Sequence, residues 1–464
     1  KDVETGKLPT VSWLVAPKNF SDHPSAPWYG AWYVSEALEI LTKNPEVWKK
    51  TIFILNYDEN DGYFDHVPPF VPPKPGDPHA GKISEGLDAR SEFVFKEQEE
   101  NYPGMDAEDV RESPVGLGYR VPLIVASPWS RGGWVNSEVC DISSTIMFME
   151  KFLSHKTGKK IREDNISSWR RTVSGDLTSA FRPYNGEDIE LPDFVNRQGH
   201  VKKILNASFK DIPDNFKALT DQEVDQVNNS HLQSAVMPVQ EPGTKPSNAL
   251  SYELYVDGEI NGERNAIVLT LEASNKRFGK YALGAPFLVY APGVYKDLKT
   301  RVSETSRNWS FAVKAGKALT YEWPLNAFEG DTYHLQVYGP NGFFRTFTGN
   351  KSDPKLSLNS SYTIDALKEN AGVFKINMEN TSLKKLTVEV KDNSYNHGEK
   401  TLTLSGKERR SIRVPTSKSK GWYDFTLKII GNNTFSKRYC GRLEFGFDSI
   451  SDPLMGGEVS INFI

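Results

Sequence analysis

The chain has 464 residues, of which 38% are hydrophobic and 25% are charged, and its formal net charge is −4. The length suffices for two or three domains with full cores, the composition excludes a disordered chain, and the slightly acidic balance excludes nucleic acid as a general partner. Its two cysteines, Cys140 and Cys440, lie far apart and no run of about 18 apolar residues occurs, so we expect no disulfide framework, zinc site or membrane-spanning helix.

Two kinds of pattern alternate in the first half of the chain. Apolar runs typical of short buried strands occur at 11–15 (VSWLV), 51–55 (TIFIL) and 121–127 (VPLIVAS). Stretches with helical periodicity occur at 33–44 (YVSEALEILTKN) and 143–155 (SSTIMFMEKFLSH). This alternation predicts an α/β layer structure in which short buried strands are covered by helices.

The composition changes after a polar, proline-containing connector at 231–250. Such a segment is typical of a domain boundary, so we assign residues 1–235 to the α/β domain. Beyond the connector, short alternating strands are separated by Gly, Asn and Pro. This pattern predicts that the remainder of the chain is all-β.

An internal repeat runs through the all-β region. Alternating apolar residues around a Gly-containing turn recur at a constant offset of 92 positions, as in a hairpin with one buried face. The two copies are Tyr333, Leu335, Val337, Gly339, Asn341, Phe343, Arg345, Phe347 and Gly349, and Phe425, Leu427, Ile429, Gly431, Asn433, Phe435, Lys437, Tyr439 and Gly441. The repeat predicts two tandem β-sandwiches of about 100 residues each, at 246–352 and 353–464.

A cluster of carboxylates follows the apolar run at 51–55, and it includes Asp58 and Glu59. Ligands of α/β proteins bind beyond the carboxyl ends of strands, where this loop is expected. Clustered carboxylates repel one another unless a cation or hydrogen-bond donors compensate them, so the loop predicts a metal-binding or phosphoryl-transfer site. A solvent-exposed acidic turn is the interpretation that the residues leave equally open. An EF-hand is excluded, because Tyr57 and Pro68 would occupy its first and last ligand positions.

Several segments resemble the bacterial phosphocholine-preferring phospholipase C family. They are SWLVAPKNFSDHPSAPWYGAWYVSEAL at 12–38, YDENDGYFDHVPP at 57–69, GLGYRVPLIVASPWSRGGWVNSEVCD at 116–141 and NISSWRRTVSGDLTSAF at 165–181. The paired C-terminal repeats are similar to the family's two β domains. The family is part of a phosphoesterase group that also contains acid phosphatases and plant non-specific phospholipases C. The likeness covers nearly all of the chain.

The resemblance implies part of an alkaline-phosphatase-like α/β core followed by two all-β sandwich domains. It implies hydrolysis of phosphate esters, with phosphatidylcholine-type lipids cleaved to diacylglycerol and phosphocholine. The family's acidic pair falls on Asp58 and Glu59, which would hold one divalent metal ion or contact the phosphoryl oxygens. Its SDHP histidine falls on His23, which would stabilise or protonate the departing group. His66, beyond the acidic cluster, is expected to fix the loop.

Two departures from the family pattern bear on catalysis. Ile142 follows the Asp of VCDISS where the family commonly has His, and Ile can neither bind a phosphate nor transfer a proton. The family's ENRSFDHY-like segment and its Ser or Thr nucleophile have no counterpart in the sequence. We therefore expect both upstream of Lys1, and the chain to be the carboxyl-terminal portion of a longer enzyme.

Two other functions stay open at this point. One is an acid phosphatase or phosphodiesterase of the same group, and the other is an inactive binding or structural fragment. The tandem β repeats favour the phospholipase. Its expected partners are a phospholipid substrate and, by peripheral contact, a membrane surface, because residues 351–464 carry 18 Lys and Arg against 13 Asp and Glu. The resemblance also implies a secreted or periplasmic location.

Overall fold

The computed structural model describes residues 1–21, 27–60, 62, 67–101, 103–104, 106, 108–130, 132–186, 196–207, 209–212, 214, 216–230, 243–364 and 372–454. Contacts divide the chain into two compact units. The first consists mainly of Lys1–Arg182 and Lys245–Asp452, and the second mainly of Pro183–Thr244. Among the described helices, none is both long and apolar enough to cross a membrane.

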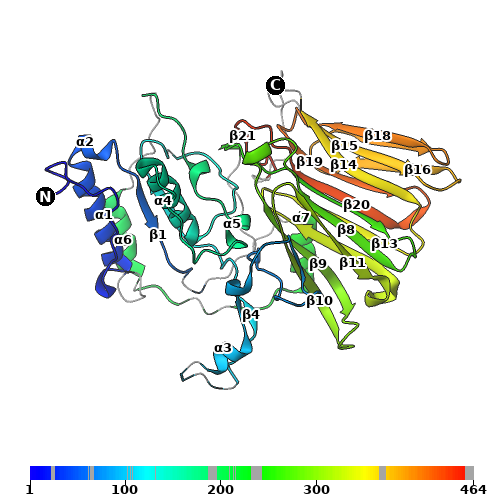
Figure 1. The fold of residues 1–464 in the computed structure, drawn as a ribbon, viewed down its shortest axis with the longest axis horizontal. Coiled ribbons are helices and arrows are strands. Elements are labelled where there is room, and N and C mark those ends of the chain that lie inside the picture. The colour runs from blue at the N-terminus through cyan, green and yellow to red at the C-terminus, as the bar shows by residue number, and fades with distance from the viewer. Residues whose placement is uncertain are drawn as a thin grey trace. The chain divides into compact units, whose positions relative to one another are not determined.

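Short helices and strands alternate in the first part of the first unit (Figure 1). The helices are α1 (Pro27–Thr42), α2 (Pro45–Trp48), α3 (Lys96–Glu100), α4 (Ile142–Thr157) and α5 (Arg170–Val173). The strands are β1 (Phe53–Asn56), β2 (Gly81–Ile83), β3 (Phe93–Val94), β4 (Ser113–Pro114) and β5 (Leu123–Ala126). Thus α1 and α4 confirm the two predicted helices, and β1 and β5 confirm two of the three predicted strands.

The expectation of buried strands is wrong for this part of the chain. The segment 11–15 forms no strand, and Val15 within it is 74% exposed. β1 pairs with β5 in an antiparallel ribbon, with Phe53 opposite Ala126, and Ile124 of β5 is 53% exposed. β1 and β5 confirm strands in two of the three apolar runs, but the side chains of β1 and β5 are half-buried or exposed and those of 11–15 are exposed.

Hydrogen bonds at the start of α4 and a glycine at its end define this helix. The Asp141 backbone N–H donates to Ser144 Oγ at 3.0 Å, and the Ser143 hydroxyl donates to Asp141 Oδ1 at 2.7 Å. These bonds use polar groups that the first turn of a helix leaves unpaired. Gly158 ends the helix with a φ of +69°, a left-handed conformation that glycine adopts without strain. The helix therefore begins within the VCDISS motif, at Ile142, and Asp141 of the motif caps it.

The β region of the first unit contains many more strands, and the second unit contains two helices. The strands are β6 (Pro246–Ser247), β7 (Leu254–Ile260), β8 (Ala266–Ala273), β9 (Ala285–Lys296), β10 (Ser303–Val313), β11 (Lys317–Pro324), β12 (Thr332–Tyr338), β13 (Phe344–Asn350), β14 (Leu356–Ile364), β15 (Gly372–Asn380), β16 (Leu386–Asp392), β17 (Glu399–Leu404), β18 (Arg409–Pro415), β19 (Trp422–Ile429), β20 (Asn432–Arg442) and β21 (Ser449–Ile450). The helices are α6 (Arg197–Ala207) and α7 (Asp221–Ser230).

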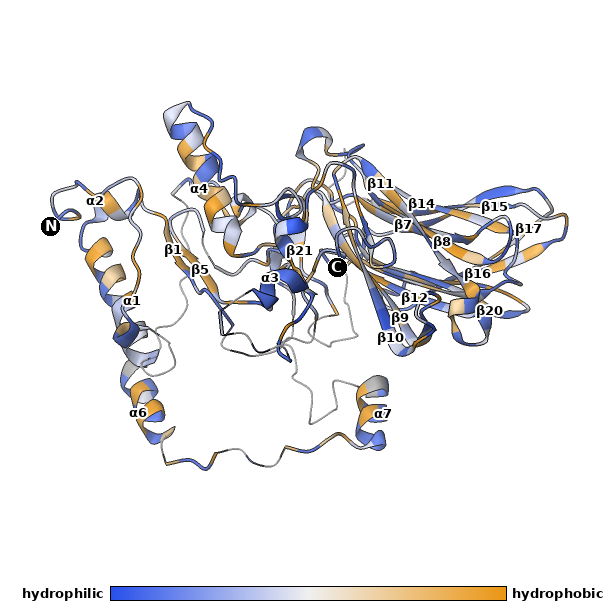
Figure 2. Ribbon diagram, turned by 60° about the horizontal axis from the view of Figure 1, so that its bottom comes forward, coloured by the Kyte–Doolittle hydropathy of each residue, from blue (hydrophilic) through white to orange (hydrophobic). Residues whose placement is uncertain are grey.

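One long sheet runs through both repeats, in the order β17-β16-β19-β20-β13-β12-β9-β10-β2. Each repeat adds a three-stranded sheet, β11-β8-β7 in the first and β14-β15-β18 in the second, and each has its own apolar core. Hydrophobic and hydrophilic residues both occur along these strands (Figure 2), as expected where one face is buried. Two separate sandwiches were expected, but the pairing of β13 with β20 makes the two repeats share a sheet.

The join between the repeats has two-fold symmetry. Arg345 lies opposite Tyr439, and Phe347 lies opposite Lys437. The offset of 92 makes Arg345 equivalent to Lys437 and Phe347 equivalent to Tyr439. Exchanging each residue for its equivalent in the other repeat therefore converts one pair into the other. Outward from the join, β20, β19, β16 and β17 on one side match β13, β12, β9 and β10 on the other, where β2 follows. The repeats therefore meet as the two subunits of an isologous dimer do, within a single chain.

β2 ties the first part of the chain to this sheet. It pairs in parallel with β10, and Gly81 lies opposite Ser310. Gly81 has a φ of +127°, and a Cβ at this position would lie 1.9 Å from the Ser310 carbonyl oxygen. Only glycine fits such a close approach of two backbones. The strand extends the shared sheet beyond the repeats and makes the α/β part and the first repeat one unit.

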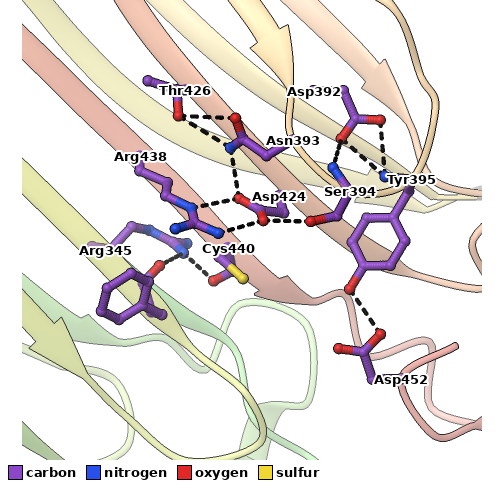
Figure 3. A network of polar contacts seen from close by, with 11 residues as sticks. Arg345, Asp392, Asn393, Ser394, Tyr395, Asp424, Thr426, Arg438, Cys440 and Asp452 are labelled. Atoms are coloured by element: carbon purple, nitrogen blue, oxygen red, sulfur yellow. Dashed lines mark hydrogen bonds and ion pairs between the residues drawn. The ribbon is translucent and has the colours of Figure 1, made fainter. Parts of the chain in front are cut away.

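A buried carboxylate organises a polar network in the second repeat (Figure 3). Asp424 of β19 is 3% exposed and accepts hydrogen bonds from Arg438 at 2.7 and 2.6 Å, Ser394 at 2.6 Å and Asn393 at 2.8 Å. Burial acts to raise the pKa of Asp424, but these hydrogen bonds and the charge of Arg438 outweigh it, and the pKa is lowered. The carboxylate is thus held in its charged form.

Asp424 should make the stability of the protein depend on pH in acid. A folded-state pKa below the ordinary value of 3.8 contributes stability above that pH, and the contribution is lost as the pH falls through the folded-state pKa. We expect Asp424→Asn to reduce the free energy of unfolding at neutral pH by about 1–3 kcal/mol and to reduce it less in strong acid. Urea unfolding of both proteins over the acid range measures this. An equal difference at every pH would contradict the assignment.

Candidate active site

The acidic loop begins where β1 ends, and Asn56 holds its start. The Asn56 side-chain amide donates to the Tyr57 carbonyl at 2.8 Å, and the Tyr57 N–H donates to the Pro122 carbonyl at 3.3 Å. The Thr145 hydroxyl of α4 donates to Asn56 Oδ1 at 3.2 Å. One amide side chain therefore connects the carboxyl end of β1, the loop and the first turn of α4.

The two predicted acidic residues follow directly. Asp58 and Glu59 are both exposed to solvent, at the carboxyl end of β1 as the strand-to-loop junction predicted. His23 and His66 lie outside the described residues, so the proposed grouping of His23 with the acidic pair stays a prediction. Exposure of both carboxylates is compatible with a ligand site and also with the acidic turn that the sequence left open.

Asp58 and Glu59 could bind a metal ion only together with further ligands. Within the described ranges, no three His, Cys, Asp or Glu side chains gather closely enough to hold a metal ion. Divalent cations such as Mg²⁺ and Ca²⁺ bind six or more oxygen ligands, and Asp58 with Glu59 offers two carboxylates. The donor type suits a hard cation, so the pair can supply some of its ligands, and water, substrate or other side chains must supply the rest.

The VCDISS motif places an apolar side chain where the family commonly has His. Ile142 is the first residue of α4 and is 49% exposed. An exposed Ile at a helix start gains little from burial, and its side chain can donate no hydrogen bond to an anion. The contribution that His makes in the family at this position is absent here, so a nearby phosphate would depend on other donors.

A buried ion-pair network, which the sequence did not predict, includes Asp141 of this motif. The Arg170 guanidinium forms ion pairs with both Asp141 and Glu92 and donates to the Gly116 carbonyl at 2.8 Å. The Ser167 hydroxyl donates to Glu92 at 2.7 Å. Burial acts to lower the pKa of Arg170, but the two carboxylates outweigh it and raise the pKa. The network positions the start of α4, and its partners lie too far apart in sequence for local patterns to reveal them.

A set of large apolar side chains in the α/β part is not covered by the described chain. α1 contains no buried residue, although Trp28, Tyr29 and Trp32 lie on it with exposed fractions of 56%, 61% and 48%. Trp13 is 66% exposed. Single exposed apolar residues are ordinary, but several bulky aromatic residues on one helix indicate a surface that packs against other polypeptide.

Comparisons with known proteins match both parts of the chain. Residues 1–154 match the Phosphoesterase family, and residues 246–350 and 356–442 each match the C-terminal domain of bacterial phospholipase C. The two matches to one domain correspond to the two repeats found from the offset of 92 positions. The first match ends at the end of β13, and the second begins at the start of β14.

Curated relatives align over almost the whole chain. The non-hemolytic phospholipase C of Pseudomonas aeruginosa is 36% identical over 98% of this chain and 60% of its own length. The non-hemolytic phospholipase C of Burkholderia pseudomallei is 33% identical, and the hemolytic phospholipase C of Pseudomonas aeruginosa is 32% identical, each over 98% of this chain and 58% of its own length. The chain thus spans about 60% of the length of the relatives it matches.

Proposed function

We propose that the chain is part of a phospholipase C acting on phosphatidylcholine-type lipids, because residues 1–154 match the Phosphoesterase family and residues 246–350 and 356–442 match the C-terminal domain of bacterial phospholipase C. In the proposed reaction the hydroxyl of water ends on phosphorus, the bond from phosphorus to the glycerol oxygen breaks, and that oxygen takes a proton. The products are diacylglycerol and phosphocholine. The observation that carries the proposal is the acidic pair at the carboxyl end of β1, within the segment that matches the phosphoesterase family.

Three residues carry the proposed chemistry. Asp58 and Glu59 would hold a divalent cation, which would neutralise charge on the phosphoryl oxygens. His23 would donate a proton to the departing glycerol oxygen. The hydrogen bonds of Asn56 to the loop and to α4 keep the backbone before the acidic pair in place, which favours a fixed geometry for the two carboxylates.

We further propose that additional polypeptide covers the exposed aromatic face of α1 and supplies the nucleophile. Two facts support this: Trp28, Tyr29 and Trp32 are about half exposed or more, and the relatives are longer than this chain. Burying three such side chains would stabilise an association by several kcal/mol, at about 1.5–3 kcal/mol for each one fully buried. The proposed active site is then shared between this chain and that polypeptide.

The product pattern tests the proposed function. A polypeptide of the relatives' length should release phosphocholine and diacylglycerol from phosphatidylcholine, detected by mass spectrometry, and the 464-residue chain alone should release neither. An acid phosphatase would instead release inorganic phosphate from phosphocholine. Hydrolysis of phosphatidylcholine by the 464-residue chain would show that the nucleophile lies within it. Absence of hydrolysis by the polypeptide of the relatives' length would overturn the proposal.

We also propose a secreted or periplasmic location and peripheral contact with the membrane. The location rests on the family resemblance, and cell fractionation with an antibody to the protein tests it. The contact rests on the substrate class, because a phospholipid presents its head group at a lipid surface. The surplus of Lys and Arg over Asp and Glu in residues 351–464 is a weak second argument, since each basic side chain close to an anionic surface contributes about 1 kcal/mol.

A further inference from the structure

Residues 201–219, in the second unit, expose a series of apolar side chains. They recur at intervals of three or four residues, the spacing of an amphipathic helix. Their exposed fractions are 44% for Val201, 66% for Leu205, 86% for Phe209, 86% for Ile212, 85% for Phe216 and 45% for Leu219. Among the described large apolar residues, Phe209, Ile212 and Phe216 are the three most exposed.

The regular spacing begins on α6 and continues past its end. Val201 and Leu205 lie one turn apart on the helix, whose hydrophobic residues are visible in Figure 2. After the helix ends at Ala207, the Phe209 N–H donates to the Asn206 carbonyl at 3.1 Å in a turn, and the described residues from there to α7 form no helix. The apolar series therefore extends from the helix into the segment that follows.

Basic residues are interleaved with this apolar series. Residues 197–219 contain Arg197, Lys202, Lys203, Lys210 and Lys217 against Asp211 and Asp214. The segment therefore has a formal charge of +3, while the whole chain has −4. The buried core of a protein–protein interface is depleted in Lys. Exposed Phe and Leu mixed with Lys and Arg are typical of segments that lie in the interface of a lipid bilayer.

We propose that residues 197–219 are a membrane-docking segment. Phe209, Ile212 and Phe216 enter the boundary between head groups and acyl chains, and the Lys side chains contact lipid phosphates. The proposal rests on the proposed function for its biological setting, because a phospholipase C must reach lipid at a surface. It does not depend on catalysis, since the exposed side chains and their charges are properties of this chain alone.

Vesicle binding by the 464-residue chain tests the proposal. The probe is a set of vesicles of phosphatidylcholine mixed with phosphatidylglycerol, and the measurement is co-sedimentation. We expect the triple variant Phe209→Ser, Ile212→Ser, Phe216→Ser to bind at least about tenfold more weakly than the parent, since each buried apolar side chain strengthens partitioning by about that factor. The matched control is Leu383→Ser in the second repeat, whose side chain is 84% exposed and which should bind as the parent does.

The charged residues provide a second, independent test. Lys202→Ala with Lys203→Ala should weaken binding at low salt, and the difference from the parent should disappear at high salt, where the charges are screened. Unchanged vesicle binding by the triple variant would overturn the proposal. A second result would also overturn it. If the parent self-associates, and the triple variant abolishes self-association but not vesicle binding, these side chains bind protein and not lipid.

The outcome is separable from the proposed catalysis. In a polypeptide of the relatives' length, the triple variant should hydrolyse the water-soluble ester p-nitrophenyl phosphocholine at the parent's rate and act more slowly on vesicles. A parent that binds vesicles through Phe209, Ile212 and Phe216 but hydrolyses neither substrate would support the docking segment and defeat the phospholipase C assignment. Equal loss on the soluble ester and on vesicles would contradict a docking role.

Discussion

Asp58→Asn should lower kcat for phosphatidylcholine hydrolysis by about two to three orders of magnitude in a polypeptide of the relatives' length. The change keeps the size of the side chain and removes the charge that would hold a divalent cation and balance the phosphoryl group. Because Asp58 is exposed, the free energy of unfolding should change by less than about 0.5 kcal/mol. Steady-state kinetics and urea unfolding of the same preparation measure the two effects.

A matched control separates a local role from a general effect of charge. Glu108 is also an exposed carboxylate of the α/β part, in a segment without helix or strand, and Glu108→Gln should leave both kcat and stability unchanged. If Asp58→Asn retained near-normal kcat in a folded protein, the acidic loop would be the solvent-exposed turn that its sequence also allowed.

Lys437→Ala should produce the largest loss of stability, about 3–5 kcal/mol in the free energy of unfolding. Lys437 of β20 is 1% exposed, and its ammonium donates to the carbonyl of Gly258 in β7, so it links the second repeat to the first. It also lies near the half-buried Asp257 of β7. Burial raises the pKa of Asp257, while hydrogen bonds from Ser360 and the charges of Arg345 and Lys437 act to lower it. Removing the cation leaves that carboxyl group with the Ser360 hydrogen bonds and the charge of Arg345 alone, so less of the cost of burying it is offset.

Two comparisons identify the cause of that loss. Lys428→Ala removes an exposed Lys from neighbouring β19 and should cost less than about 0.5 kcal/mol. Adding Asp257→Asn to Lys437→Ala should cost less than the sum of the two single changes, because the carboxyl group that lacks its partner is then also gone. Strict additivity would show that Lys437 stabilises the protein through packing alone and not through Asp257.

The elements that the sequence predicted well are those whose pattern is local. The helical periodicity at 33–44 and 143–155 located α1 and α4, and the offset of 92 positions located the two repeats. The strand predicted at 11–15 failed because its apolar residues imply a burial partner that the described chain does not contain. Periodicity reports which residues favour burial, and it carries no information about the polypeptide that covers them.

Long-range pairing accounts for the remaining differences. The offset identified equivalent hairpins, but it contained no sign that β13 and β20 would pair and fuse the repeats into one sheet. Arg170 was missed because its partners Glu92 and Asp141 approach it only in the folded chain. For the candidate site, the strand-to-loop junction correctly placed Asp58 and Glu59 at the end of β1, whereas their chemical role came from the family resemblance and awaits experiment.

The position of a bound product tests the central claim most directly. A crystal structure of the polypeptide at its relatives' length, grown with phosphocholine and a divalent cation, should show the phosphate or the cation in contact with Asp58 and Glu59 at the carboxyl end of β1. Phosphocholine bound elsewhere, for example in the groove that Tyr255 and Tyr362 line between the two repeats, with the acidic pair still in solvent, would contradict the assignment of this loop as the active site.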